Sequence, residues 1–222
     1  MDSGPLYMAM NMRDIDMFRL HLPNLHRING FNNTQDIHDT VLKVANWCYS
    51  NYFDHGLLAC LEAGMSPDLT DEAGENTILA LAAKSSRNNI ISLLLSQGAD
   101  ADALSVYGRS ALLEASIVNN IEGINLLAKA GCNLDIKDPA QFTPLLNAIA
   151  DGSTTACLRL IELGADLTPP TSFSFSSLGD FARAMGHEEC AKAVETAIAT
   201  KCAEELKDST CAVGRNATRR TL

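Results

Sequence analysis

Large aromatic side chains are scarce in this sequence. Only 5% of its 222 residues are Phe, Trp or Tyr, although 46% are hydrophobic. The apolar residues must therefore pack mainly through Leu and Ala, which suits pairs of helices better than a core built around large rings.

Positive charge is also scarce. The chain carries a formal net charge of −10, and its basic cluster is confined to Arg215, Arg219 and Arg220 near the C-terminus. Nucleic-acid binding is not expected, because contacts to phosphates require clustered Lys and Arg side chains. The acidic body of the chain fits a basic partner and, equally well, simple solubility.

Long apolar segments are missing. The N-terminus has no apolar region that would suit a secretory signal, and no run approaches the roughly 18 apolar residues of a membrane span. We therefore expect no membrane contact and a cytoplasmic location, where the seven cysteines stay reduced.

Patterns typical of catalytic and metal sites are missing as well. The five histidines form no HExxH motif, no CxxC pair is present, and no nucleotide-binding motif occurs. We expect no catalytic residue, no cofactor and no metal site. The alternative is a thiol-dependent enzyme with Cys48 as nucleophile and His55 as base, although no oxyanion donor or orienting acid can be assigned to that pair.

What the sequence contains is a repeat with a fixed period. Three sets of residues recur at intervals of 33: Leu79, Leu112 and Leu145; Ala82, Ala115 and Ala148; and Gly98, Gly131 and Gly164. Three residue types that share one interval indicate an architecture in which each unit packs against its neighbours.

Each unit carries the signals of two short helices. Thr143 followed by Pro144 places a capping hydroxyl and a fixed φ at a helix start. Leu145 and Ala148 then lie on one helical face, where the small alanine lets the neighbouring unit approach closely. Gly164 ends the second helix, because glycine adopts a left-handed backbone at little cost.

This unit resembles the ankyrin repeat. The resemblance rests on Thr143-Pro144-Leu145 with Ala148, on Leu160-Ile161 at the end of the second helix, and on Gly164-Ala165-Asp166 before a β-turn finger. It implies an all-α ankyrin-repeat solenoid of stacked helix-turn-helix units with β-turn fingers, about six repeats including degenerate terminal caps.

The repeat alanines divide the chain into units. A single domain, residues 1–207, is expected to precede a polar tail, residues 208–222. Within the domain the predicted units lie near residues 5–38, 39–70, 71–104, 105–137, 138–170 and 171–207.

The sequence departs from the ankyrin pattern in two ways. Gln141 stands where a finger usually has glycine, which leaves the turn geometry there open. The histidine that usually follows the helix leucine, and that makes hydrogen bonds between loops, is replaced by Ala80, Leu113 and Leu146.

Two irregular segments carry half of the large aromatic rings. The stretch Asn46–Gly56 contains three extra residues, the single Trp and two Tyr, and forms either a plug for the first interface or a contact surface. The long last finger contains Phe173 and Phe175, through which the protein would self-associate if it does so at all.

The resemblance implies a concave face lined by the fingers and by the first helix of each unit. Apolar or hot-spot residues at positions that the scaffold leaves free predict a binding surface, and irregular packing of the fingers is the alternative explanation. The predicted partner-binding residues are Trp47, Lys84, Leu104, Val106, Tyr107, Arg109, Ile117, Val118 and Phe142.

The implied function is non-catalytic protein binding, as an adaptor, inhibitor or targeting subunit that is monomeric on its own. The same features fit the recognition domain of a secreted bacterial effector that acts on a host protein.

Overall fold

The computed structural model describes residues 5–21, 43–71, 73–169 and 175–217. Short helices follow one another along these segments, and one of them includes residues 43–50. The others are α1 (Pro5–Met12), α2 (Ile15–His21), α5 (Asp54–Glu62), α6 (Ile78–Lys84), α7 (Asn88–Ser96), α8 (Ala111–Ile117), α9 (Ile121–Lys129), α10 (Pro144–Ala150), α11 (Thr154–Leu163), α12 (Leu178–Ala184) and α13 (Glu188–Ala217).

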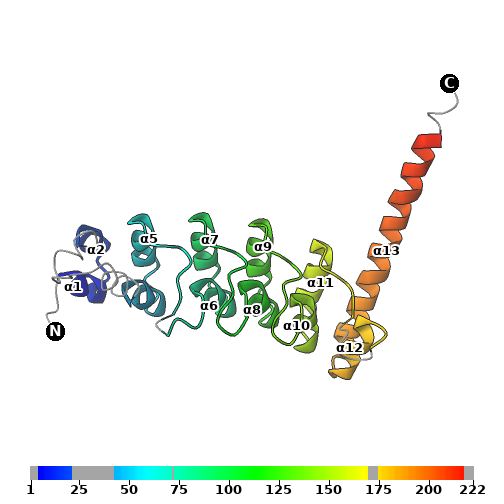
Figure 1. The fold of residues 1–222 in the computed structure, drawn as a ribbon, viewed down its shortest axis with the longest axis horizontal. Coiled ribbons are helices and arrows are strands. Elements are labelled where there is room, and N and C mark those ends of the chain that lie inside the picture. The colour runs from blue at the N-terminus through cyan, green and yellow to red at the C-terminus, as the bar shows by residue number, and fades with distance from the viewer. Residues whose placement is uncertain (1–4, 22–42, 72, 170–174, 218–222) are drawn as a thin grey trace.

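The helices form an elongated stack with two rows, as Figure 1 shows. Helices α6, α8, α10 and α12 follow one another in one row, and α7, α9, α11 and the start of α13 follow in the other. Within each unit the two helices also pack against each other, as α8 does against α9. The predicted all-α stack of helical hairpins is therefore confirmed.

Hydroxyl groups cap the first helices of four units, α6, α8, α10 and α12. Their oxygens accept hydrogen bonds from the backbone N–H three residues further on, at 3.0–3.3 Å, and so satisfy donors that have no partner inside the helix. Pro144 occupies the first turn of α10, as predicted. The capping residues are Thr77, Ser110, Thr143 and Ser177.

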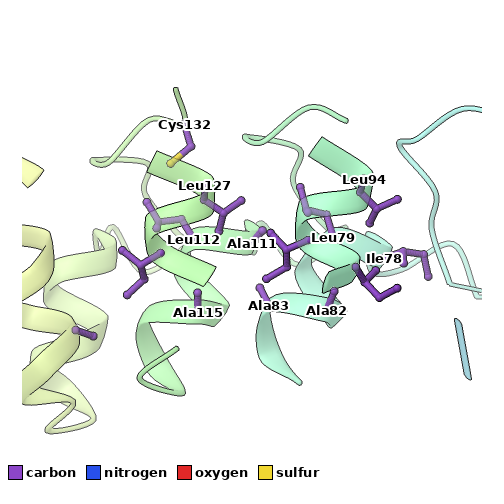
Figure 2. Close-up of a cluster of buried hydrophobic side chains, with 14 of the residues drawn as sticks. Ile78, Leu79, Ala82, Ala83, Leu94, Ala111, Leu112, Ala115, Leu127 and Cys132 are labelled. Atoms are coloured by element: carbon purple, nitrogen blue, oxygen red, sulfur yellow. The ribbon is translucent and has the colours of Figure 1, made fainter. Parts of the chain in front are cut away.

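The repeated leucines and alanines form the core between units. Leu79, Leu112 and Leu145 are at most 4% exposed, and Figure 2 shows the first two in the layer between neighbouring units. Burial of each such leucine stabilises the fold by roughly 2 kcal/mol. Ala82 and Ala115 are fully buried beside them, so a larger side chain there would push adjacent units apart.

The glycine at the end of each second helix has the predicted left-handed backbone. Gly98, Gly131 and Gly164 have φ values of 86°, 87° and 100°. A residue with a Cβ atom would be strained at each of these positions. This explains why glycine recurs at the same position of successive repeats.

Neighbouring units are joined by a set of hydrogen bonds that do not involve the histidine usual in ankyrin repeats, which this chain lacks. The donors stand at the start of the second helices, also one repeat apart, and each reaches a backbone carbonyl oxygen of the preceding unit. They are Arg87 to Tyr49, Asn120 to Ala83, Ser153 to Ile117 and His187 to Ala150. The loops are therefore linked from a different repeat position.

Gln141 adopts the turn geometry that glycine would provide. Its φ is 68°, equal to the value at Gly108 in the preceding finger. The turn is therefore kept, at the cost of a left-handed backbone on a residue with a side chain.

The two ends of the chain differ from the regular middle. The backbone of α13 is helical as far as Ala217, beyond the predicted domain end at residue 207 and into the predicted tail. The predicted boundary near residue 38 and the side chain of Phe173 lie outside the described residues. Phe175 is half-buried, with its ring centroid 5.3 Å from that of Phe181.

Candidate protein-binding surface

The loops between units form narrow turns that end at the first helices. We call three of them finger 1 (residues 65–77), finger 2 (residues 99–110) and finger 3 (residues 132–143). In finger 1 Thr70 and Thr77 form an antiparallel β-bridge. In finger 2 the N–H of Ser105 donates to the carbonyl of Arg109 at 2.9 Å, so the two arms of the turn are held together.

Adjacent fingers touch one another near their tips. The N–H of Val106 donates to the carbonyl of Glu75 at 2.9 Å, which joins finger 2 to finger 1. Pro139 lies one repeat after Val106 and has no N–H, so this bond is not repeated in finger 3. Instead, the ring of Pro139 packs on Gly108, where an added Cβ atom would come within 2.9 Å of the ring.

Carboxylates join the bases of successive fingers. Oδ1 of Asp68 accepts the backbone N–H of Asp100 at 2.7 Å, and Oδ1 of Asp102 accepts that of Asn133 at 2.8 Å. Asp135 repeats the contact with Asp166 at 2.7 Å. These bonds fix the spacing of the fingers, so side chains on neighbouring fingers present a continuous surface.

Three of the predicted residues form an exposed apolar group on finger 2. Leu104, Val106 and Tyr107 are 50%, 68% and 54% exposed, whereas Ser105 between them is buried. Val106 and Tyr107 occupy the turn of finger 2, which the N–H of Gly108 closes by donating to the carbonyl of Ser105 at 2.9 Å. We call Leu104, Val106 and Tyr107 the finger patch.

Glu75 of finger 1 borders this patch. A hydrogen bond to Glu75, together with the charge of that carboxylate, raises the pKa of the Tyr107 hydroxyl. The phenol is therefore neutral at physiological pH, and its ring is positioned by a group on the neighbouring finger.

Arg109 lies beside the patch but is occupied within the chain. Its Nε atom donates to Oε1 of Glu114 at 2.9 Å, and both side chains are largely covered. Arg109 therefore positions the base of finger 2, and its charge is already matched by a carboxylate.

Other predicted residues lie at the opposite end of the first helices. Lys84 ends α6 and Ile117 ends α8, and Val118, which follows α8 directly, is 38% exposed. Helix α8 has seven residues, which places its two ends about 10 Å apart at 1.5 Å per residue. The structure thus divides the predicted surface into the finger patch and a second group formed by Lys84, Ile117 and Val118.

The two remaining aromatic residues of the predicted set are packed against the core. Trp47 and Phe142 are both half-buried. The ring of Phe142 meets that of Phe181 edge-on, with centroids 5.7 Å apart. Substitution of Phe142 therefore disturbs the contact with the last unit as well as any surface.

The aromatic insertion in the second unit has two roles: part of it fills the first interface between units, and part of it lies on the surface. Phe53 is buried and contacts Phe18 edge-on at 5.6 Å, so it seals the first interface. Tyr52 is 70% exposed, and the guanidinium of Arg87 lies 4.4 Å from its ring centroid and 4.3 Å from that of Tyr49. Arg87 also donates to Asp54 at 2.6 Å.

Sequence reasoning missed the position of Arg87 between these rings. Arg87 is separated from Tyr49 and Tyr52 in the sequence by about one repeat. An arginine at the start of a helix is also ordinarily expected to be exposed to solvent. The available signal was its repeat position, which is equivalent to that of Asn120 and Ser153 and is used to join units.

The suggested thiol site is not assembled for catalysis. Cys48 is fully buried, and its thiol interacts with Cys60, whereas His55 is exposed. The hydrogen bond with Cys48 and burial raise the pKa of Cys60 far above its ordinary value. Within the described residues, no group of His, Cys, Asp and Glu side chains is arranged to hold a metal ion.

A second buried pair of thiols has the same character. The sulfur atoms of Cys157 and Cys190 are 3.7 Å apart between α11 and α13. The hydrogen bond between them, together with burial, raises the pKa of Cys157. These thiols pack as small apolar groups.

Residues 48–138 match the family model for ankyrin repeats, in three copies. This part of the chain carries ankyrin repeats. This agrees with the helical hairpins, the capped first helices and the β-turn fingers, and ankyrin repeats imply a role in protein–protein interaction.

Known proteins that resemble this chain do so over limited stretches. Human protein phosphatase 1 regulatory subunit 27 is 42% identical over 59 residues, which is 27% of this chain and 38% of that protein. E3 ubiquitin-protein ligase KEG of Arabidopsis thaliana is 35% identical over 78 residues, covering 35% of this chain. The ankyrin repeat domain-containing protein SAT10 of Stachybotrys chartarum is 32% identical over 100 residues, covering 45%.

The chain spans well under two thirds of each of these relatives. The matched stretch is 5% of KEG and 5% of SAT10. The likeness therefore concerns the repeats themselves. No helix among the described residues is both long enough and apolar enough to cross a membrane.

Proposed function

We propose that this protein is a non-catalytic adaptor or regulatory subunit that binds a partner protein through the finger patch. The observation that carries the proposal is the exposure of Leu104, Val106 and Tyr107 on a rigidly supported turn. Exposed apolar groups of this kind mark interaction sites when they are contiguous, and tyrosine is enriched at binding hot spots.

A regulatory role is supported by one of the relatives. Protein phosphatase 1 regulatory subunit 27 is named as a regulatory subunit, and a stretch of it shares 42% identity with 59 residues of this chain. We assign this chain the same kind of role, control or targeting of another protein, and leave the target to be found by experiment.

The finger patch is tested by affinity capture from a cell extract. We would compare the unaltered protein with a Val106→Ser/Tyr107→Ala variant. The matched control is a Met12→Ser/Met185→Ala variant, since Met12 and Met185 are 72% and 42% exposed but lie in the end units. The expected result is a captured polypeptide that is lost with the patch variant and retained with the control.

The stability of both variants is measured alongside capture. The melting temperature of the patch variant should stay within about 2 °C of the parent, because exposed substitutions change stability by less than ~0.5 kcal/mol. Equal capture by the parent and the patch variant would rule out the patch as the binding site. A large drop in melting temperature would assign Val106 and Tyr107 to packing of the fingers.

A second variant tests whether the surface extends along the first helices. Lys84→Ala/Val118→Ser alters the group at the far end of α6 and α8 while leaving the fingers intact. Loss of capture with this variant as well would place both groups in one interface, and retention would confine the partner to the fingers.

A further inference from the structure

The chemistry around the finger patch indicates what kind of partner segment it fits. Leu104, Val106 and Tyr107 are each at least half exposed at the turn of finger 2, so three apolar side chains lie close together on one finger. A partner segment that covers them must present apolar side chains of its own.

The described parts of fingers 1 and 2 are strongly acidic. Arg109 is the basic residue in these two segments, and it is paired with Glu114. The carboxylates are Asp68, Asp71, Glu75, Asp100 and Asp102.

These carboxylates are engaged by neutral donors. Asp68, Asp100 and Asp102 each accept a backbone N–H group, and Asp71 accepts both the amide of Asn76 and a backbone N–H. Glu75 interacts with the Tyr107 hydroxyl. Among the described residues no ion pair neutralises any of them, and the charges of Glu75 and Asp71 act on Tyr107 of the patch.

We propose that the finger patch binds a polypeptide segment that carries apolar side chains together with Lys or Arg. The apolar side chains would cover Leu104, Val106 and the Tyr107 ring, and the basic side chains would reach the carboxylates of fingers 1 and 2. Charge complementarity of this kind favours the correct partner and speeds association, because like charges are rejected. This inference rests on the proposed function and adds the chemistry of the partner.

The test uses short fluorescent peptides and the full chain. In the probe, valine alternates with arginine; in one comparison peptide glutamate replaces every arginine, and in another serine replaces every valine. Fluorescence anisotropy gives the dissociation constant for each. We expect the probe to bind at least about tenfold more tightly than either comparison peptide, and its affinity to fall as salt screens the charges.

Two pairs of protein substitutions separate a local effect from the overall acidity of the chain. Glu75→Gln/Asp71→Asn removes the two charges that act on Tyr107, and the amide oxygens can still accept from Tyr107 and from the backbone N–H of Glu75. Glu122→Gln/Glu162→Gln removes two charges from the exposed side of α9 and α11. We expect about tenfold weaker probe binding for the first pair and less than about twofold for the second.

Each outcome decides a different question. Equal weakening by both pairs, or tight binding of the glutamate peptide, overturns the proposal, because binding would then follow net charge or ignore charge altogether. A partner that is captured from extract and lost with Val106→Ser/Tyr107→Ala, while no peptide discriminates by charge, overturns this inference and leaves the proposed function standing. If the patch variant still captures the partner and no peptide discriminates by charge, both this inference and the proposed function are overturned.

Discussion

At the scale of single residues, the turn between the two helices of a unit requires a left-handed backbone. Four residues at this repeat position have positive φ: Ser86 at 54°, Asn119 at 57°, Gly152 at 70° and Gly186 at 88°. The glycines adopt this conformation at little cost, whereas Ser86 is strained. Asn119 gains a compensating contact, because its Oδ1 accepts the N–H of Ala156 at 2.9 Å.

The strain at Ser86 gives a prediction. Ser86→Gly should stabilise the protein by about 0.5 kcal/mol, since relief of the left-handed conformation exceeds the added entropy of glycine in the unfolded chain. The free energy of unfolding in urea measures the change. Asn119→Gly is the control and should destabilise, because it also removes the bond to Ala156. A less stable Ser86→Gly variant would contradict this account.

Cys132 gives a prediction about pH. Burial and the nearby charge of Asp102 raise the pKa of Cys132 to about 11, from the ordinary value of 9.0. A raised pKa in the folded state contributes stability that is fully present below pH 9 and is lost as pH rises toward 11, because the unfolded chain ionises first. The equivalent residues of the neighbouring units are Ala99 and Ala165.

Cys132→Ala should therefore fold and should lose less stability at alkaline pH than the parent. Between pH 8 and pH 10 the difference in unfolding free energy should move in favour of the variant by about 1 kcal/mol. Urea unfolding at both pH values gives this difference. A difference that is constant over this range would show that the thiol titrates at its ordinary pKa in the folded protein.

At the scale of elements, helices of seven to ten residues are too short to be stable alone. Each depends on contacts to the next unit, and Asn120 makes several of them. Its Nδ2 donates to the carbonyl of Ala83 at 3.2 Å and to Asn88 at 2.9 Å, while its Oδ1 caps α9 by accepting from Gly123 at 2.9 Å.

Removal of these contacts should be costly. Asn120→Ala is expected to destabilise the protein by about 2–3 kcal/mol, the loss of a helix cap together with unpaired buried groups in the preceding unit. Asn120→Asp keeps the cap and loses the donors, so it separates the link between units from the cap. Ser153→Ala, which loses one bond to Ile117, should cost about 1 kcal/mol.

Urea unfolding of the three variants provides the measurement. An Asn120→Ala variant no less stable than Ser153→Ala would contradict the assignment of Asn120 as a joint between units. The conclusion rests on the order of the three free energies of unfolding and not on any one value, because the energy of a single contact depends on its context.

At the scale of the whole molecule, the regular part of the fold was predictable because it repeats. Thr143 caps a helix, Leu145 packs between units and Gly164 ends a helix, and these three requirements recur along the repeats. The finger patch was also visible in the sequence, because the scaffold does not require apolar residues at Leu104 and Val106.

Two features could not be predicted from the sequence. One is the division of the predicted surface into two groups, and the other is the set of contacts made by residues outside the repeat pattern. Ile117 lies in the same helix as residues near the fingers, and only the length of α8 shows that it stands at the other end. Phe142 was assigned to the surface because Phe181 comes from a different unit. The long course of α13 was missed because its last residues are polar, which composition alone assigns to a tail.

The direction of α13 has a practical consequence. Thirty residues at 1.5 Å each give a rod of about 45 Å, and Figure 1 shows its far end well clear of the repeats. A dye or an immobilising tether attached to that end would therefore stand apart from Leu104, Val106 and Tyr107. Surface-based measurements can be oriented in this way without obstructing the side of the molecule on which recognition is sought.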